Sequence, residues 1–152
     1  MLPAEPPQEA PVEAKIAWAD DGFDRVGSHL LQDQALGNFL QALKLAIQRS
    51  RKEMQQAGIV PLCRECEEQE GGSCCGAGLE KHYSAKLLLI NRLLGVTLPS
   101  QREDPSSCFF LSSSGCTLLA RHVLCINYVC NKITSRIKPD QLAALRDAEC
   151  EE

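Results

Sequence analysis

Apolar residues recur at three- and four-residue steps in three stretches of the chain, which is the pattern of amphipathic helices. The first stretch predicts one long helix from Ser28, as its N-cap, to about Gly58 and Pro61. Its expected apolar face consists of Leu36, Phe39, Leu40, Leu43, Ala46, Ile47 and Met54. The second stretch, "SAKLLLINRLLG", predicts a largely buried helix from Ser84 to about Leu94, with Gly95 as the C′ residue.

The third stretch begins at Thr117 and predicts a helix, after which Pro139 either ends that helix or opens a short last one. Its expected stripe consists of Leu119, Val123, Ile126, Cys130, Ile133 and Ile137. Between the second and third helices, "CFFL" predicts a short extended piece within a loop. Aromatic content is only 5% and hydrophobic content 44%, so the core should be built from aliphatic helix faces.

The segment before the first helix has a different composition. Residues 1–15 carry four prolines among alanine and glutamate and should not bury enough surface to offset chain entropy. We therefore predict a flexible acidic tail over 1–27, an N-terminal helix over 28–61, a cysteine-cluster domain over 62–138, and a short helix and tail over 139–152. The expected fold class is mainly α: a small single-domain helical protein whose cysteine-rich loops are organised around a metal centre.

The charge pattern narrows the expected partners and location. The net charge of −4 comes entirely from residues 1–27, and the remainder is neutral, so there is no strong nucleic-acid signal. We interpret the small basic patch around Arg49 and Arg51 as a solvated helix face. The chain begins with no secretory signal and has no apolar run of about 20 residues, so we expect a cytoplasmic protein that does not cross a membrane. Another protein as a partner is left open.

Four of the nine cysteines lie close together in "CRECEEQEGGSCCGAGLE", which is expected to form a glycine-rich loop. In a reducing compartment, cysteines this dense indicate metal binding more often than disulfides. The spacing of Cys63 and Cys66 allows both sulfurs to face one ion, although a redox pair uses the same spacing. A disulfide between Cys74 and Cys75 would be strained. Either both serve a metal, or one does while the other packs, or both are small buried apolar side chains.

The later cysteines extend the candidate site. Cys108 and Cys116 flank "FFLSSSG", whose Ser/Gly turn can bring the two thiols back towards one place. On one continuous helix, Cys125 and Cys130 would project about 140° apart and should not share an ion. Core packing is an equal alternative for Cys130, and Cys150 is interpreted as a bystander. We interpret the three histidines as structural or exposed, with His82 the best placed of them to bind metal.

Taken in order, these segments resemble the YkgJ-type cysteine-cluster family, a zinc- or iron-chelating domain. The similarity rests on "CRECEEQEGGSCC", "SAKLLLINRLLG" and "CFFLSSSGCTLLARHVLC" and covers residues 63–130. His122 stands where the family has proline after Arg121, and the gap between Cys66 and Cys74 is longer than usual. The resemblance implies the ligands Cys63, Cys66, Cys74, Cys75, Cys108, Cys116 and Cys125, to which we add Cys130, which the family does not require.

These observations predict a metal-binding protein that holds Zn²⁺ or an iron–sulfur cluster through cysteine thiolates; the spacing does not choose between the two cofactors. A flagellin lysine N-methylase carries a similar cluster, so the resemblance also implies an alternative: an iron–sulfur-dependent enzyme or enzyme component, methylase-like or an oxidoreductase. We find no catalytic grouping and no phosphate-binding loop, and therefore name no catalytic residue. A third hypothesis is a disulfide-stapled protein.

Overall fold

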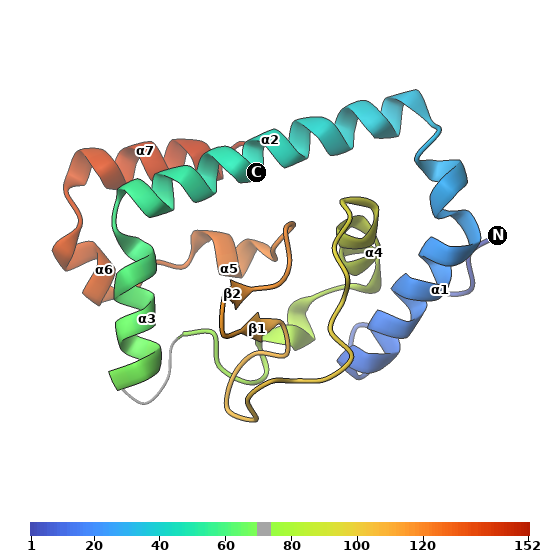
Figure 1. The fold of residues 1–152 in the computed structure, drawn as a ribbon, viewed down its shortest axis with the longest axis horizontal. Helices are drawn as coiled ribbons and strands as arrows, with labels where there is room; N and C mark the ends of the chain where they lie inside the picture. Colours follow the sequence, from blue (N-terminus) through green and yellow to red (C-terminus); the bar gives the residue numbers. More distant parts are fainter. Residues whose placement is uncertain (70–73) are drawn as a thin grey trace.

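Helices make up most of the computed structural model, which describes residues 1–69 and 74–152 (Figure 1). Their order is α1 (Val12–Leu30), α2 (Gln34–Gln56), α3 (Ile59–Gln69), a 3₁₀ turn η1 (Leu79–His82), α4 (Ala85–Leu93), α5 (Val123–Asn127), α6 (Asn131–Arg136) and α7 (Pro139–Glu149). A two-stranded hairpin, β1 (Leu111–Ser112) and β2 (Gly115–Cys116), stands between α4 and α5. The mainly helical fold class and the single small domain are thereby confirmed.

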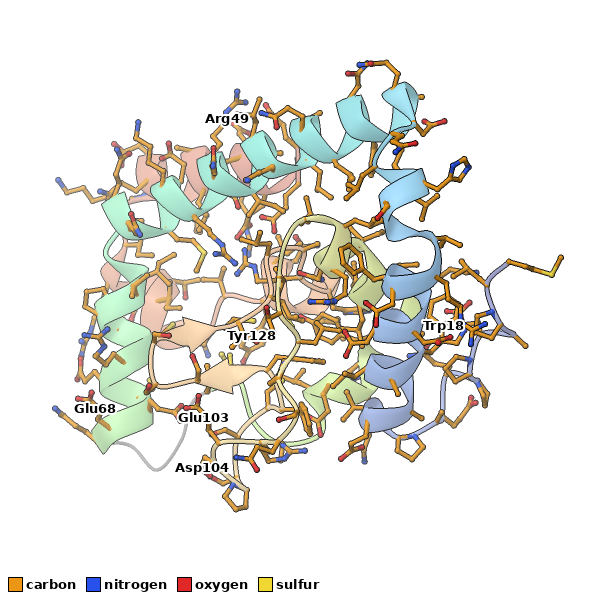
Figure 2. All side chains as sticks on the ribbon, turned by 45° about the vertical axis from the view of Figure 1, so that its right-hand side comes forward. Trp18, Arg49, Glu68, Glu103, Asp104 and Tyr128 are labelled. Carbon is orange, nitrogen blue, oxygen red and sulfur yellow. The ribbon has the colours of Figure 1, made fainter. Side chains whose placement is uncertain are left out.

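Helix α1 corrects the prediction of a flexible tail over residues 1–27. Val12, Ile16 and Ala19 are buried at helical spacing in the cluster that includes Leu88 and Leu89 of α4, and α1 packs beside α4 (Figures 1 and 2). The segment ahead of the helix is also held, since the Trp18 indole donates to the Pro3 carbonyl at 3.1 Å. The proline and acid content of residues 1–27 obscured this apolar stripe in the sequence, because the prolines precede the helix and none of the acids is buried.

The long helix predicted from Ser28 is correct in its body and wrong in its start. Ser28 lies within α1, and the chain turns after Leu31 before α2 begins. The N-cap of α2 is Asp33, whose Oδ1 accepts from the Leu36 N–H at 2.8 Å. Leu40 and Ile47 are buried on the predicted face, whereas Phe39 is 57% exposed and lies outside it. Figure 2 shows Arg49 pointing outward from α2, as predicted, whereas Arg51 is half-buried and donates to the Leu118 carbonyl, so the predicted solvated face is wrong at Arg51.

Cys63 and Cys66 lie in helix α3, not in the predicted loop. The preceding helix is separated from α3 by a sharp turn at Gly58, whose positive φ of 72° allows it. The chain is then helical again through Pro61. Pro61 is the third residue of α3, where no intrahelical bond needs its missing N–H. In the sequence, Pro61 was interpreted as a sign that the preceding helix ends. A proline near the start of a new helix is equally compatible with the sequence.

Helix α4 follows the prediction closely. The Ser84 hydroxyl caps it by accepting from the Leu87 N–H at 3.2 Å, and Gly95 follows the helix with φ +92°, a conformation that favours glycine. Leu88 and Leu89 are buried, as expected for a helix with few polar residues. The extended piece predicted near "CFFL" corresponds to β1, which pairs antiparallel with β2 so that Leu111 lies opposite Cys116.

The predicted third helix is wrong as one continuous element. The structure has two short helices, α5 and α6, and both Tyr128 and Cys130 between them have extended backbone. None of the five residues of α5 is buried, although Cys125 packs partly against the core, whereas α6 buries Ile133. The break matters for the cysteines, because Cys125 and Cys130 are no longer bound to one helical stripe. The last helix, α7, begins with Pro139 at its first position, as predicted.

Two apolar clusters form the core. The first joins α1, α4 and the segment before the hairpin, with Leu88, Phe110 and Leu118 fully buried at its centre. The second joins α3, α6 and α7 through Ile59, Ile133 and Leu145. Helix α2 runs along α7 and leads into α3, so it joins the two sides of the molecule (Figure 1). Cys75, Cys108 and Cys125 pack with the first cluster, and Cys63 and Cys130 with the second.

Candidate metal centre

Five of the predicted ligands line one pocket of about 660 Å³. They come from the segment before η1, the hairpin region and α5, and are Cys74, Cys75, Cys108, Cys116 and Cys125. Most of the remaining lining is apolar, including Leu79, Leu111 and Leu124. Tyr128, labelled near the hairpin in Figure 2, also lines the pocket. Cysteines more than fifty residues apart in the sequence therefore face one cavity.

Backbone hydrogen bonds hold two of these segments together. The Cys108 N–H donates to the Cys75 carbonyl at 2.7 Å, and the Ala77 N–H donates to the Ser106 carbonyl at 2.9 Å. Gly76 and Ser107 form an antiparallel bridge between them. The Cys74–Cys75 pair is consequently fixed beside Cys108, although 33 positions separate Cys75 from Cys108 in the sequence.

A buried carboxylate reinforces this junction. The Glu80 side chain is 6% exposed and accepts from the Gly78 N–H at 2.9 Å and the Phe109 N–H at 3.4 Å. Arg102 pairs with the same carboxylate at 2.5 Å. Burial alone would raise the pKa of Glu80, but the Arg102 guanidinium and the backbone donors outweigh it and lower the pKa below its ordinary value. Glu80 therefore remains ionised and ties the cysteine segments to each other.

A buried side-chain amide similarly holds the segment between Cys116 and Cys125 in place. Asn91, fully buried in α4, accepts through Oδ1 from the N–H groups of Leu119 and Ala120 at 2.8 and 3.0 Å. Its Nδ2 donates to the carbonyls of Ala120 and Leu87 at 2.8 and 2.9 Å. All of the hydrogen-bonding capacity of its NH₂ group is used, so α4 holds residues 118–120 in one place.

The other three predicted ligands lie on the side of α3 and α6. Cys63 and Cys66 are one helical turn apart on α3, and Cys130 is the residue that precedes α6. Cys63 and Cys130 both pack against the second core cluster. Glu65 joins the two helices by ion pairs with Lys132 at 3.3 Å and Arg136 at 3.4 Å. Cys150 is exposed at the end of α7 and is not among the residues that line the pocket.

Burial favours the protonated thiol at several of these positions. It raises the pKa of Cys63 and of Cys108 to about 11 each. Cys116 opens onto the pocket, yet surrounding protein raises the pKa of its thiol, while Arg121 and Arg51 act in the opposite direction. A hydrogen bond between the adjacent thiols raises the pKa of Cys74 and lowers that of Cys75.

Two polar side chains that the sequence analysis did not assign to the site contact it. Tyr83 is buried, and its hydroxyl donates to the Cys125 sulfur at 3.6 Å. Arg121 lines the pocket, and its guanidinium pairs with Glu152 at 3.4 Å. Arg51 donates to the Leu118 carbonyl at 2.6 Å and so borders the same region. Asn91 could have been recognised as a polar residue inside an apolar helix, whereas nothing local in the sequence marks Tyr83.

In this structure the cysteine thiols face each other, but they do not converge closely on a single point. Across residues 1–69 and 74–152, no three Cys, His, Asp or Glu side chains are close enough together to hold one metal ion. All nine cysteines, which lie within those residues, are free thiols. The donor set itself suits a thiophilic metal, since it consists of cysteine sulfurs with arginines beside them to offset thiolate charge. The metal centre and its cofactor stay predictions.

Comparison with known proteins adds no assignment, because no protein-family model, curated protein or solved structure matches the chain. The resemblance to the YkgJ-type family thus stays a prediction carried by the residues themselves. In the portion of the chain that the structure describes, no helix has the length and apolar character needed to cross a membrane.

Proposed function

We propose that this chain binds metal through cysteine thiolates and holds either Zn²⁺ or an iron–sulfur cluster. The observation that carries the proposal is the convergence of five cysteines, from three segments of the chain, on one pocket. Cysteine is a small fraction of an ordinary globular chain, and an inert core uses single buried thiols as packing atoms. Five thiols around one cavity have a common chemical use as soft ligands.

The surroundings of the thiols support the same function. Four thiolates around Zn²⁺ leave a net charge of about −2, which a dry apolar pocket would disfavour without nearby cations. Arg121 lines the pocket, and Arg51 lies close enough to Cys116 to act on its pKa. Tyr83 supplies a hydrogen bond to the Cys125 sulfur, as outer partners of metal ligands commonly do. A bound thiolate cluster would therefore find both charge compensation and hydrogen bonding.

Metal binding on this account draws the thiols inward from their present separation. The backbone on either side of the cysteines contains glycines with positive φ, Gly78 at +106° and Gly115 at +107°, which mark tight turns beside the ligands. Raised thiol pKa values mean that a metal must displace protons from the cysteines as it binds. Metal binding is then coupled to local ordering, and removal of the metal should lower thermal stability.

The test is metal analysis of the full chain after expression and purification without oxygen. We expect bound zinc, or iron together with inorganic sulfide, and for the latter a visible sulfur-to-iron charge-transfer absorption. Cys75→Ser should reduce the bound metal and lower the melting temperature, whereas the matched variant Cys150→Ser should leave both unchanged. A chain that is purified without metal, and then takes up neither Zn²⁺ nor iron and sulfide, would contradict the proposal.

A further inference from the structure

Arg121 lies between the cysteine pocket and a buried carboxylate that does not line it. Its side chain is 10% exposed and lines the pocket, and its Nη2 pairs with the Glu152 carboxylate at 3.4 Å. Deepening the proposed function, and resting on it, we propose that Glu152 competes with the metal–thiolate centre for Arg121. The carboxylate is then a built-in competitor that weakens metal binding, and metal binding in turn weakens the ion pair.

Glu152 is held from inside the molecule where it meets Arg121. Its side chain is 1% exposed, although the residue follows the end of α7. The Ser50 hydroxyl of α2 donates to Glu152 Oε2, the same oxygen that accepts from Arg121. The preceding residue, Glu151, is exposed and pairs with the exposed Arg49. Two neighbouring glutamates therefore have opposite environments, and it is Glu152 that is bonded to the arginine of the pocket.

The ion pair between Arg121 and Glu152 is incomplete on both sides. A charge-assisted N–H···O bond is normally about 2.7–2.9 Å long, and this one is 3.4 Å. Arg121 Nε and Glu152 Oε1 are buried and have no hydrogen-bond partner among the residues that the structure describes. Arg121 Nη1 donates to the weak acceptor Met54 Sδ at 3.8 Å. A buried pair with unpaired polar atoms recovers little of its desolvation cost, so Arg121 still gains free energy from a second anion.

Metal binding would place such an anion in the pocket. Cysteine thiols are mostly protonated near neutral pH, and they lose their protons as they bind Zn²⁺. Four thiolates around one zinc ion carry a net charge of about −2. Arg121 and five cysteines line the same pocket, whereas Glu152 is not among the lining residues and is tied to Ser50. Movement of the guanidinium towards the thiolates therefore lengthens its distance to Glu152 and weakens the ion pair.

Competition for one cation makes the two contacts antagonistic, and the antagonism is reciprocal. If metal binding weakens the contact between Arg121 and Glu152, the intact contact weakens metal binding by the same factor. Coupling between two sites commonly changes an affinity by about 5–150-fold. A merely structural role for Glu152, in which it holds Arg121 in place for the metal, has the opposite sign, since loss of the carboxylate would then weaken metal binding.

The test compares the zinc affinity of the full chain and its variants, by competition with a chromophoric chelator in the absence of oxygen. Glu152→Gln keeps an acceptor for Ser50 but removes the charge, and it should tighten zinc binding by about fivefold or more. Glu151→Gln is the matched control and should leave the affinity unchanged, because its partner Arg49 is exposed. Ser50→Ala, which removes the tether of Glu152 without removing a charge, should also tighten binding.

A double variant shows whether the effect passes through Arg121. Arg121→Gln should weaken zinc binding, and adding Glu152→Gln to it should produce no tightening. Far-ultraviolet circular dichroism checks that each variant keeps its helices, and if Glu152→Gln does not, the uncharged change Ser50→Ala decides the matter alone.

Unchanged or weaker zinc binding by a folded Glu152→Gln variant would overturn the competition. An equal tightening in the Arg121→Gln background would also overturn it, because the carboxylate would then act on the metal centre directly. Both results require that wild type binds zinc. Binding of no Zn²⁺ by wild type, and of no iron with sulfide, would instead contradict the proposed function itself.

Discussion

Asn91 offers the most direct test of how the fold holds the cysteine segments. Asn91→Ala removes four hydrogen bonds and leaves the N–H of Leu119 and both backbone groups of Ala120 without their partner. Ala120 is 5% exposed, so water cannot readily replace the lost bonds there. Each buried backbone group left unpaired costs about 1–3 kcal/mol. Because Leu119 is half-buried and gains some solvent, we expect a total loss of about 3–4 kcal/mol.

Such a loss is a large share of the stability of a small domain, which is about 5–15 kcal/mol. Urea unfolding of the metal-free chain, followed by circular dichroism, measures it as a lower midpoint with an unchanged slope. Asn38→Ala is the matched control, because Asn38 is exposed in α2 and its amide oxygen accepts from the exposed Gln34 side chain. Asn91→Asp should be at least as damaging as alanine, since a carboxylate cannot donate to the Ala120 carbonyl.

The reasoning would be refuted by an Asn91→Ala variant within about 0.5 kcal/mol of wild type, the range of ordinary surface substitutions. A second consequence concerns the site. Residues 118–120 lie between Cys116 and Cys125, so their release should also weaken zinc binding, in a competition titration with a chromophoric chelator. Unchanged zinc affinity in a clearly destabilised variant would show that Asn91 supports the fold without positioning the thiols.

Two further predictions concern Glu80 and α1. Because the pKa of Glu80 is lowered on folding, its contribution to stability should be complete above its ordinary value of 4.5 and lost as the pH falls through the folded pKa. Glu80→Gln should flatten this acid limb in pH-dependent thermal unfolding, and the exposed Glu103→Gln should leave it as in wild type. Ile16→Ala should cost about 2–5 kcal/mol in urea unfolding followed by Trp18 fluorescence. An effect no larger than that of the exposed Ala17→Ser would mean that α1 does not pack on α4 in solution.

The sequence predicted elements well where a local signal coincides with burial. Ser84 and Gly95 bound α4 because a capping hydroxyl and a left-handed glycine act over a few residues. Pro139 likewise begins α7. The long apolar face of α2 was predicted correctly, but its start was missed because Asp33 is as good a cap as Ser28 and only tertiary packing distinguishes them.

The errors arose where partners distant in sequence decide the structure. Helix α1 is stabilised by contact with α4, which composition alone does not reveal. The run from Val123 to Ile137 has helical periodicity throughout, yet none of the α5 residues in its first part is buried, and the helix is interrupted before Cys130. The angle predicted between the side chains of Cys125 and Cys130 assumed one continuous helix, so it does not apply once the helix is interrupted.

Part of the candidate site was predictable and part was not. The ordered cysteines indicated that the two halves of the sequence meet, and five of them do line one pocket. Glu80 and Asn91 hold the two parts of the chain together through buried hydrogen bonds to distant backbone groups. Single residues of this kind carry no periodic signal, so only the folded arrangement identifies them.

The central claim is that cysteine sulfur binds the metal, and X-ray absorption spectroscopy of the zinc-loaded full chain tests it most directly. We expect four sulfur neighbours per zinc at about 2.3 Å, the distance of zinc–thiolate bonds. The same spectrum should be retained in Cys150→Ser. A first shell made of nitrogen or oxygen at about 2.0–2.1 Å would contradict the account, since the metal would then be held by other side chains.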